Sequence, residues 1–375
     1  MNMSNILIRK YLEGDEAGIV SLLDSTFNGW PHVDTELSPI EYWRWKYLET
    51  PLPSEISVGV DGTKIVSCHH TNTLKIQLID KEIPGATALD FAVHPDYRGM
   101  GLSSRTSRCT EKNQEHLGIH FRYFITRNPL LIKSYQDSST PKNRRPFFPK
   151  TLVNMTRIRD IDLQLDTMPE KYGSLKGIGV KGLQKWNQLT TRKGTINKDL
   201  QISLEDRFTG CTPFLEKISD EYRFMVKRSE EYLNWKYAYP KLGDYRISII
   251  SEGENMLGYS VLRINRYNPH YPVGYIVDML TLKDRTDALN NLLFNATTYF
   301  DENNINIVNS QIIKGHYSQK LLENHGFLDS RIKIQMYYNL GAPIEMATLS
   351  DTHPDLLFIS WGDHDVLPVG KRKFD

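Results

Sequence analysis

A short aromatic motif that occurs twice constrains the fold of this chain more than any other feature of its sequence. The heptapeptide EYWRWKY at Glu41–Tyr47 returns as EYLNWKY at Glu231–Tyr237, displaced by 190 positions and identical at five of seven. Each copy is followed by an apolar run with one aspartate, Asp90 in ALDFAV and Asp278 in YIVDML, displaced by 188. Similar displacements of two separate features indicate an internal repeat. We therefore predict two copies of one domain, each of about 150 residues, an ordinary domain size.

The composition is that of an ordinary soluble globular protein. Of the 375 residues, 39% are apolar and 24% charged, and the net charge of +1 indicates no strongly charged partner. Three cysteines are too few and too scattered for a disulfide framework, which favours a reduced, cytoplasmic setting. The N-terminus lacks the apolar core of a signal peptide, and no run of about 18 apolar residues is present to span a membrane. We therefore expect a cytoplasmic protein with no membrane partner.

Hydrophobic periodicity predicts strands and helices in mixed order. In the first copy, strand patterns cover 6–12, 55–60, 64–78, 86–93, 122–126 and 150–158. Helical patterns begin at Asp15 and cover 39–48, about 102–116 and 129–136. The second copy repeats the later part, with strands at 245–251, 257–264, 274–280, 305–311 and 332–340 and helices near 285–300 and 317–327. This order predicts an α/β fold of the α+β mixed-sheet kind: two tandem domains, each a twisted mixed sheet flanked by helices.

A basic segment separates the two predicted domains. Residues 171–198 contain seven Lys or Arg residues and no acidic residue. We interpret this segment as a solvated bridge, and a basic surface for an anionic partner or a coenzyme phosphate is the alternative. The predicted boundaries are 1–160 for a catalytic domain, 161–200 for the linker and 201–375 for a degenerate second domain.

The sequence between strand 86–93 and the helix that follows it is typical of an anion-binding turn. It reads VHPDYRGMGLSS from Val93 to Ser104, so that Gly99 and Gly101 precede the first helical turn and Arg98 adds a positive charge. Glycines expose main-chain N–H groups, and a helix N-terminus attracts negative charge. A P-loop would require Gly-Lys-Ser/Thr, and a dinucleotide-binding turn would require a third glycine where Ser104 stands; neither signature fits.

These residues resemble the GCN5-related N-acetyltransferase (GNAT) superfamily, whose hallmark is Val-x-Pro-x-x-Arg-Gly-x-Gly-x-Gly/Ala. Val93, Pro95, Arg98, Gly99 and Gly101 match it, and Ser103 replaces the final Gly or Ala. The resemblance implies acetyl-CoA as the co-substrate, with the loop amides around the pyrophosphate and the preceding strand along the pantetheine; it implies no metal. The implied coenzyme-binding positions are Phe91, Ala92, Val93, Arg98, Gly99, Met100, Gly101, Leu102, Ser103 and Ser104.

The resemblance also suggests residues for catalysis. Asn128 and Tyr135 have the family's spacing of an asparagine and a tyrosine. This implies that Asn128 binds the coenzyme and that Tyr135 protonates the departing thiolate. A helix cap remains the alternative for Asn128, and a packing aromatic the alternative for Tyr135.

A base is also needed, because a primary amine attacks the thioester directly and arrives mostly protonated. Asp90 is the candidate base, since burial raises the pKa of a carboxylate. His69, His70 and Glu41 are alternatives, and a structural role for Asp90 stays open because Asp278 persists in the second copy.

The second copy lacks the features of the glycine loop. A helix followed by Gly-Phe places Leu322 at the position of Tyr135, displaced by 187. The same displacement brings Thr286 to the position of Gly99, Ala288 to that of Gly101 and Gly315 to that of Asn128. Side chains would then stand where phosphates meet bare backbone. We predict that the second copy is non-catalytic and shapes the acceptor site or supports the first copy.

The leading hypothesis is an N-acyltransferase that moves an acetyl group to a primary amine of a small molecule, an amino sugar or a peptide. The alternatives are a longer acyl or aminoacyl donor and a non-catalytic binding module, which senses acyl-CoA or holds nucleic acid through residues 171–198. We do not expect a nucleic-acid partner. The cluster WGDHD at Trp361–Asp365 is interpreted as a turn rather than a metal site. A monomer and a homodimer are both compatible with the sequence.

Overall fold

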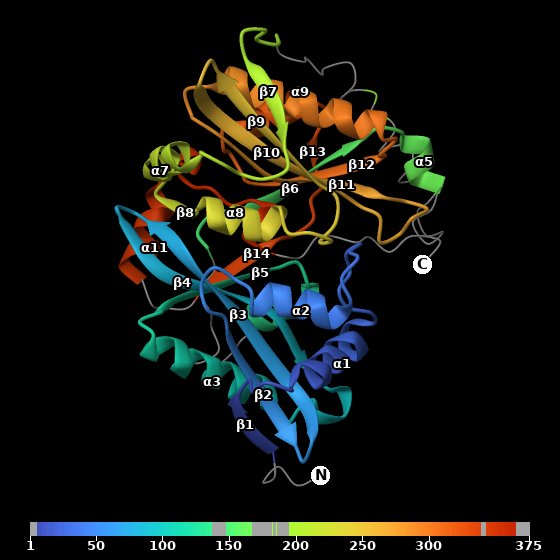
Figure 1. Ribbon diagram of the computed structural model, residues 1–375, viewed down its shortest axis with the longest axis vertical. Helices are drawn as coiled ribbons and strands as arrows, with labels where there is room; N and C mark the ends of the chain where they lie inside the picture. Colours follow the sequence, from blue (N-terminus) through green and yellow to red (C-terminus); the bar gives the residue numbers. More distant parts are fainter. Residues whose placement is uncertain are drawn as a thin grey trace. The chain divides into compact units, whose positions relative to one another are not determined.

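The computed structural model describes residues 6–136, 148–166, 182, 185, 195–338 and 343–364. Its chain forms two compact units, coloured by position along the sequence in Figure 1. Unit 1 comprises Met1–Pro149, Phe224–Gly243 and Gln335–Asp351. Unit 2 comprises Lys150–Arg223, Asp244–Ile334 and Thr352–Asp375. Most of the basic segment 171–198 lies outside the described residues.

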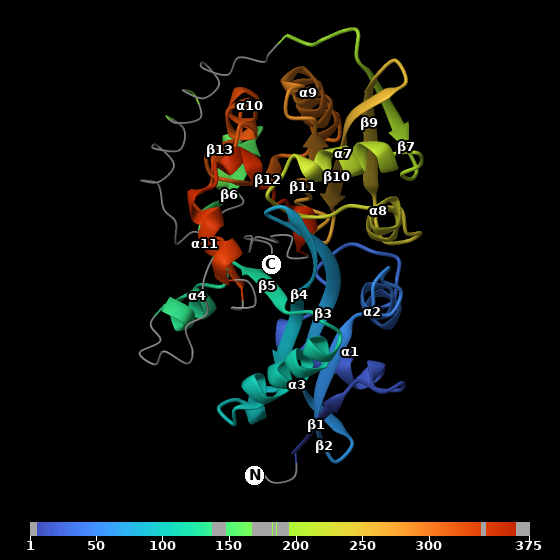
Figure 2. The same ribbon diagram turned by 90° about the vertical axis from the view of Figure 1, so that its left-hand side faces the viewer.

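Unit 1 is built on a mixed sheet with the strand order β1-β2-β3-β4-β5-β14, and β8 pairs with β3. The strands are β1 (Ile6–Lys10), β2 (Glu55–Asp61), β3 (Lys64–Leu78), β4 (Lys81–Val93), β5 (Phe121–Thr126), β8 (Phe224–Val226) and β14 (Gln335–Tyr338). Its helices are α1 (Glu16–Phe27), α2 (Pro39–Tyr47), α3 (Leu102–His116), α4 (Pro129–Gln136), α8 (Glu230–Tyr237) and α11 (Pro343–Asp351). Helices α1 and α2 lie on one face of the sheet, and α3 lies on the other (Figure 2). The pairing is antiparallel except between β4 and β5, which run parallel.

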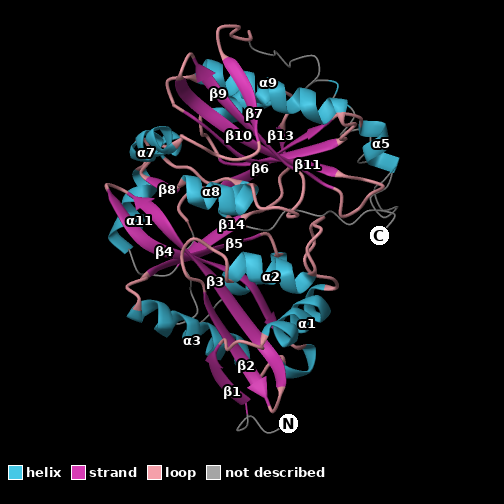
Figure 3. Cartoon of the chain, in the orientation of Figure 1, coloured by secondary structure: helices cyan, strands magenta, loops and turns pink. Residues whose placement is uncertain are grey.

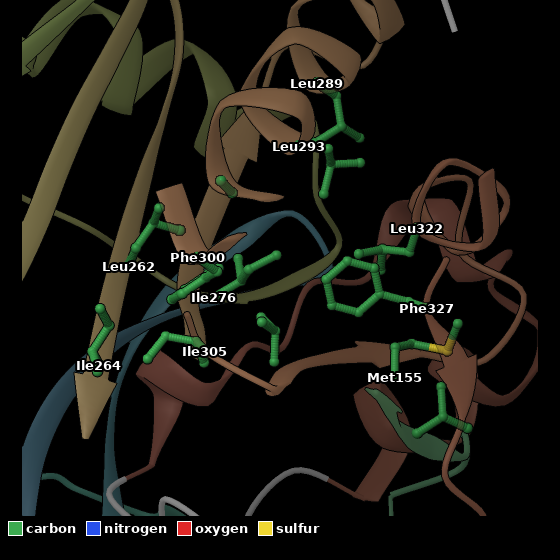
Figure 4. Packing of buried hydrophobic residues seen from close by; sticks show 13 residues of the cluster. Met155, Leu262, Ile264, Ile276, Leu289, Leu293, Phe300, Ile305, Leu322 and Phe327 are labelled. Carbon is green, nitrogen blue, oxygen red and sulfur yellow. The ribbon is translucent and has the colours of Figure 1, made fainter. Parts of the chain in front are cut away.

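Unit 2 contains a second mixed sheet, with the order β13-β6-β12-β11-β10-β9-β7 (Figure 3). The strands are β6 (Leu152–Ile158), β7 (Gln201–Glu205), β9 (Tyr245–Glu252), β10 (Asn255–Asn265), β11 (Val273–Thr281), β12 (Ile307–Ile313) and β13 (Leu328–Asp329). The helices are α5 (Ile161–Asp166), α7 (Thr212–Asp220), α9 (Thr286–Glu302) and α10 (Ser318–Asn324). Apolar side chains of α9 and α10 pack on those of β6 and β10 to β12 and form the core of this unit (Figure 4). Two mixed sheets with flanking helices confirm the predicted fold class.

The two copies exchange their last strands. The sequence predicts that β6 closes the first sheet and that the strand containing β14 closes the second, but β6 pairs with β12 and β14 pairs with β5. Each strand pairs antiparallel with the strand it joins, so the exchange preserves the kind of pairing in each sheet. The compact units therefore take segments from both sides of the boundaries expected at residues 160 and 200.

The repeated motif lies on α2 and α8, and both helices belong to unit 1. The indole Nε1 of Trp45 donates to the carbonyl oxygen of Trp235 at 3.1 Å, and the Nε1 of Trp235 donates to the carbonyl oxygen of Trp45 at 3.1 Å. The two rings stack with centroids 5.3 Å apart. Equivalent residues that contact each other reciprocally are the mark of a two-fold relation, here within one chain.

Among the residues that the structure describes, no helix is both long and apolar enough to cross a lipid bilayer.

Candidate functional site

The parallel strands β4 and β5 diverge after a short stretch of pairing. They pair from Gly85 and Phe121 to Thr87 and Tyr123. β4 then continues to Val93, and within the described residues this later part of the strand does not pair with β5. Successive residues of a strand direct their N–H and C=O groups to alternate sides. Part of the main chain of β4 therefore faces no partner strand where the strand approaches the glycine loop.

Strand β4 is bulged at Asp90. Its register with β3 shifts between Cys68 and His70, and Asp90 has a φ of +35°, which is rare for a residue with a side chain. Lys46 Nζ and Tyr47 Oη donate hydrogen bonds to Asp90 Oδ2 at 2.6 and 2.7 Å. His70 Nδ1 lies 2.9 Å from the carbonyl oxygen of Asp90. Both the side chain and the carbonyl group of this residue are therefore held.

The tautomer of His70 follows from its two partners. Trp43 Nε1 lies 3.0 Å from His70 Nε2, and an indole nitrogen can only donate. His70 Nε2 is therefore the acceptor, and Nδ1 carries the proton that it donates to Asp90. Burial lowers the pKa of His70 to about 4, although the charge of Asp90 opposes this shift. His70 is thus a neutral structural donor at physiological pH.

The surroundings of Asp90 bear on its predicted role as the base. Burial raises the pKa of its carboxyl group, but the charge of Lys46 and the hydrogen bonds from Lys46 and Tyr47 outweigh burial, so that the pKa is lowered. A carboxylate with a lowered pKa is a weaker proton acceptor. Among the alternatives, Glu41 closes a capping box with Ser38 at the start of α2, and His69 contacts Thr110 of α3. The assignment of the base stays a prediction.

The glycine loop exposes main-chain N–H groups at the start of α3. Gly99 and Gly101 have φ values of +81° and +68°, and a Cβ atom at either position would meet no heavy atom within 4 Å. The N–H of Arg105 donates to the carbonyl oxygen of Gly101 at 3.2 Å, which is the first hydrogen bond of the helix. The N–H groups that precede Arg105 in α3 therefore have no acceptor within the helix and form the positive end of its dipole.

The predicted coenzyme-binding positions differ in what they expose. The side chains of Arg98, Ser103 and Ser104 are exposed, and that of Phe91 is 38% exposed. Ala92 and Leu102 are 1% exposed, so their side chains are not available to a ligand. The side chains of Val93 and Met100 pack against a small buried cluster that contains Leu102. A short 3-10 helix at Pro95–Tyr97 connects the end of β4 to the glycine loop and α3.

Polar contacts fix α3 against β3. Buried positions on α3 recur every four residues, a rise of about 6 Å, and residues on one face of β3 recur every two, a rise of about 6.6 Å. The two spacings nearly match, and three pairs form at 2.7, 3.1 and 2.7 Å: Ser67 with Thr106, His69 with Thr110 and Thr71 with Gln114. These three contacts hold the start of α3 in a defined position relative to β3.

The structure places Asn128 and Tyr135 at the start and end of α4. Asn128 Oδ1 accepts hydrogen bonds from the N–H groups of Leu130 at 3.0 Å and Leu131 at 3.5 Å, which is a helix cap. The ring of Tyr135 packs against Phe124 and Tyr337, with centroids 5.7 and 4.9 Å apart. These contacts match the structural alternatives for both residues, and their roles toward the coenzyme and the thiolate stay predictions.

Side chains of the protein itself occupy the corresponding helix start in unit 2. Arg285 forms paired hydrogen bonds with Asp287 and with Glu252, at distances from 2.9 to 3.2 Å. Asn197 Nδ2 donates to Asp287 Oδ2 at 2.9 Å. The hydrogen bond from Arg285 holds the pKa of Asp287 well below its usual range. A carboxylate of the chain therefore lies at the positive end of α9, and Ala288, at the position of Gly101, is fully buried.

A late segment of the chain lines the space between β11 and β12. These strands pair in parallel along their first residues, and residues 357–360 line the space beyond with residues of both strands. Ser360 Oγ donates to Asp278 at 3.1 Å, and Gln311 Nε2 donates to the carbonyl oxygen of Ser360 at 3.5 Å. Trp361 and His364 are buried, which agrees with a structural role for this stretch; Asp365 lies outside the described residues. No cluster of potential metal ligands is present within the described ranges.

The residues of α2 that hold Asp90 are not among the site residues expected from the sequence. Trp43, Lys46 and Tyr47 stand at positions i, i+3 and i+4, so they share one face of the helix. The repeated motif contains all three, and a buried aspartate within an apolar strand requires a donor. These two signals together could have predicted the contact between Lys46 and Asp90.

Comparisons with known proteins agree with this geometry. The family model described as an acetyltransferase (GNAT) domain matches residues 7–123. No curated protein matches the sequence.

Three solved structures share the fold. A probable N-acyltransferase from Enterococcus faecalis is 12% identical, with a TM-score of 0.60, and the match covers 89% of this chain and 72% of the other. N-myristoyltransferase from Saccharomyces cerevisiae, solved with bound myristoyl-CoA, is 11% identical, with a TM-score of 0.60 and coverage of 90% and 80%. A GCN5-related N-acetyltransferase from Anabaena variabilis is 10% identical, with a TM-score of 0.60 and coverage of 91% and 74%.

The family match includes the bulged β4, the glycine loop, all of α3 and the first residues of β5, and the solved structures match over most of the chain. Residues 7–123 of this chain are therefore an acetyltransferase domain of the GNAT family, accompanied by a second mixed sheet.

Proposed function

We propose that this protein is an N-acyltransferase that moves the acetyl group of acetyl-CoA to a primary amine, and that unit 1 carries the reaction. The observation that carries the proposal is the start of α3. Two exposed glycines with positive φ precede the N–H groups that have no acceptor within the helix, and the strand before this loop diverges from its parallel neighbour. Such a turn binds a diphosphate, and the adjacent strand offers main-chain groups to an extended ligand.

In this proposal each stretch of the site has a separate task. The main chain of Phe91–Val93 follows the pantetheine, and residues 98–104 surround the pyrophosphate. Arg98 adds a full positive charge, and Asn128 contacts the coenzyme near the start of α4.

The reaction forms a bond between the amine nitrogen and the acyl carbon and breaks the bond between that carbon and sulfur. Asp90 removes the proton of the amine, a main-chain N–H near Val93 stabilises the oxyanion, and Tyr135 protonates the thiolate. The acceptor is a small molecule, an amino sugar or a peptide that carries a primary amine.

We further propose that unit 2 is non-catalytic. The carboxylate of Asp287 lies where a phosphate would bind, and residues 357–360 line the space between β11 and β12. A ligand would have to displace both. Unit 2 then supports unit 1 or contributes to the acceptor site.

The test compares two glycine variants of matched geometry. Gly101 and Gly118 lie near opposite ends of α3, both have positive φ, and a Cβ atom at either has open space around it. Acetyl-CoA at 100 times its dissociation constant should stabilise the wild type by about 2.7 kcal/mol. We expect Gly101→Val to abolish the ligand-induced rise in Tm and Gly118→Val to keep it. Equal responses of the two variants would contradict the proposed site.

A longer acyl donor is a second candidate. The similar structure of N-myristoyltransferase contains bound myristoyl-CoA, so the fold accommodates a long chain in that protein. Thermal shifts with acyl-CoA esters from acetyl to myristoyl distinguish the two. A maximum at acetyl supports the first candidate, and a steady rise with chain length supports the second.

A further inference from the structure

One face of α2 converges on a single residue of β4. Lys46 and Tyr47 bind the carboxylate of Asp90 directly, and Trp43 acts on its carbonyl group through His70. The side chain of Lys46 is 5% exposed and that of Asp90 is 14% exposed, so little water competes for these bonds. Helix α2 thus fixes both the carboxylate and the carbonyl group of Asp90, the residue at which β4 is bulged.

The backbone of Asp90 needs such support. A positive φ at a residue with a side chain is unfavourable, and it persists only where the surrounding structure imposes it. Without its partners, Asp90 could return to the extended conformation. The residues of β4 beyond Asp90 would then turn to the opposite face of the sheet. The N–H groups of Phe91, Ala92 and Val93 would turn toward different neighbours.

A buried ion pair is a costly way to hold a fold together. Apolar residues of similar size often stabilise a buried site as well or better, and in some proteins a buried ionic group instead fixes the conformation. The ammonium of Lys46 also lies within 5.3 to 5.9 Å of the ring centres of Trp30, Tyr42 and Tyr47. Three rings and one carboxylate leave this side chain little freedom of position.

We propose that Lys46 is a positioning residue: it holds Asp90 so that one main-chain N–H group of Phe91–Val93 donates to the carbonyl oxygen of the bound acyl group. The inference rests on the proposed function and deepens it. Lys46 itself touches neither substrate. Tyr47 and the Trp43–His70 pair act on the same residue, with Tyr47 supplying the second of two donors to the carboxylate.

The test measures the carbonyl group directly. Acetyl-CoA labelled with ¹³C at the carbonyl is bound to the full-length protein, and its resonance is compared with that of free acetyl-CoA. We use Lys46→Met/Asp90→Asn, which removes both buried charges together, and Tyr47→Phe, which removes one donor. Lys75→Met is the control, because Lys75 forms an exposed ion pair with Glu82 on the same sheet. Dissociation constants for CoA and acetyl-CoA are measured in parallel.

Hydrogen bonds to the carbonyl should shift the bound resonance of the wild type and of Lys75→Met. In the double variant we expect the resonance to return toward its free position, and in Tyr47→Phe to move part of the way. The preference for acetyl-CoA over CoA should fall by about tenfold in the double variant, the worth of one hydrogen bond.

The positioning role is overturned if the carbonyl resonance of acetyl-CoA bound to the double variant lies at its wild-type position. If the double variant does not fold, the same result with Tyr47→Phe overturns it. The role is also overturned if the carbonyl resonance of acetyl-CoA does not move when the ligand binds to the wild type. If the wild type binds neither CoA nor acetyl-CoA, the proposed function itself fails and this inference falls with it.

Discussion

At the scale of single residues, two buried histidines make the stability of this protein sensitive to acid. Burial lowers the pKa of His70 in unit 1 and of His316 in unit 2 to about 4. An unfolded chain has histidines with a pKa of about 6.5. Between these values the unfolded state binds a proton that the folded state excludes. The contribution of each neutral histidine to the free energy of unfolding is complete above about pH 6.5 and is lost as the pH falls toward 4.

We therefore expect the free energy of unfolding to fall between pH 6.5 and pH 4, by about 3 kcal/mol for each histidine. His70→Asn keeps a donor for the carbonyl of Asp90 but cannot titrate, so it should remove about half of this dependence. His120→Asn, at an exposed position, should leave it unchanged. Urea denaturation across this pH range measures the effect. An unaltered pH dependence in His70→Asn would show that His70 is not held neutral.

At the scale of elements, the position of α3 depends on hydroxyl groups in its interface with β3. Ser67 and Thr106 are fully buried, and their hydroxyl oxygens lie 2.7 Å apart. Thr106 also donates to the carbonyl oxygen of Leu102 in the first turn of the helix. A buried hydroxyl without a partner costs more than the bond contributes when it is made. The interface is thus specific, because sliding α3 along β3 would leave these groups unpaired.

We expect Thr106→Val to destabilise the protein by about 1–3 kcal/mol, because it leaves the hydroxyl of Ser67 buried without this partner. Adding Ser67→Ala should recover part of that loss, since both polar groups are then absent. A double-mutant cycle by urea denaturation measures the coupling. Ser107→Ala, in a half-buried contact with Glu111, serves as the comparison and should change stability much less. Additive effects of the first two substitutions would contradict the contact.

At the scale of the whole molecule, the units depend on segments that are distant in sequence. Unit 1 takes β8, α8 and β14 from the second half of the chain. In this unit β14 covers the edge of β5, β8 pairs with β3, and Trp235 stacks on Trp45. An uncovered strand edge and exposed aromatic rings favour aggregation.

We expect residues 1–160, produced alone, to lack a cooperative thermal transition, because that segment lacks β8 and Trp235, the partners of β3 and Trp45. Producing residues 161–375 in the same cells should restore a soluble complex of the two segments. Circular dichroism and co-purification measure the two outcomes. A stable monomer with well-dispersed amide resonances from residues 1–160 alone would show that the segments from the second half of the chain are dispensable for folding.

The sequence by itself determined the features that are local or periodic. The repeat, the strands of β-branched and aromatic residues, and the turn around Gly99 and Gly101 all depend on neighbours within a few positions, so their patterns could be interpreted directly. The short β7 was missed because its pairing with β9, rather than its own five residues, makes it a strand.

The tertiary structure decided what depends on the meeting of distant segments. Main-chain pairing of antiparallel strands does not depend on which side chains they carry, so no pattern within β6 or β14 specifies which sheet each one joins. A carboxylate has its pKa set by the charges and donors around it, so Asp90 could be placed on its strand, while its pairing with Lys46 required the folded chain.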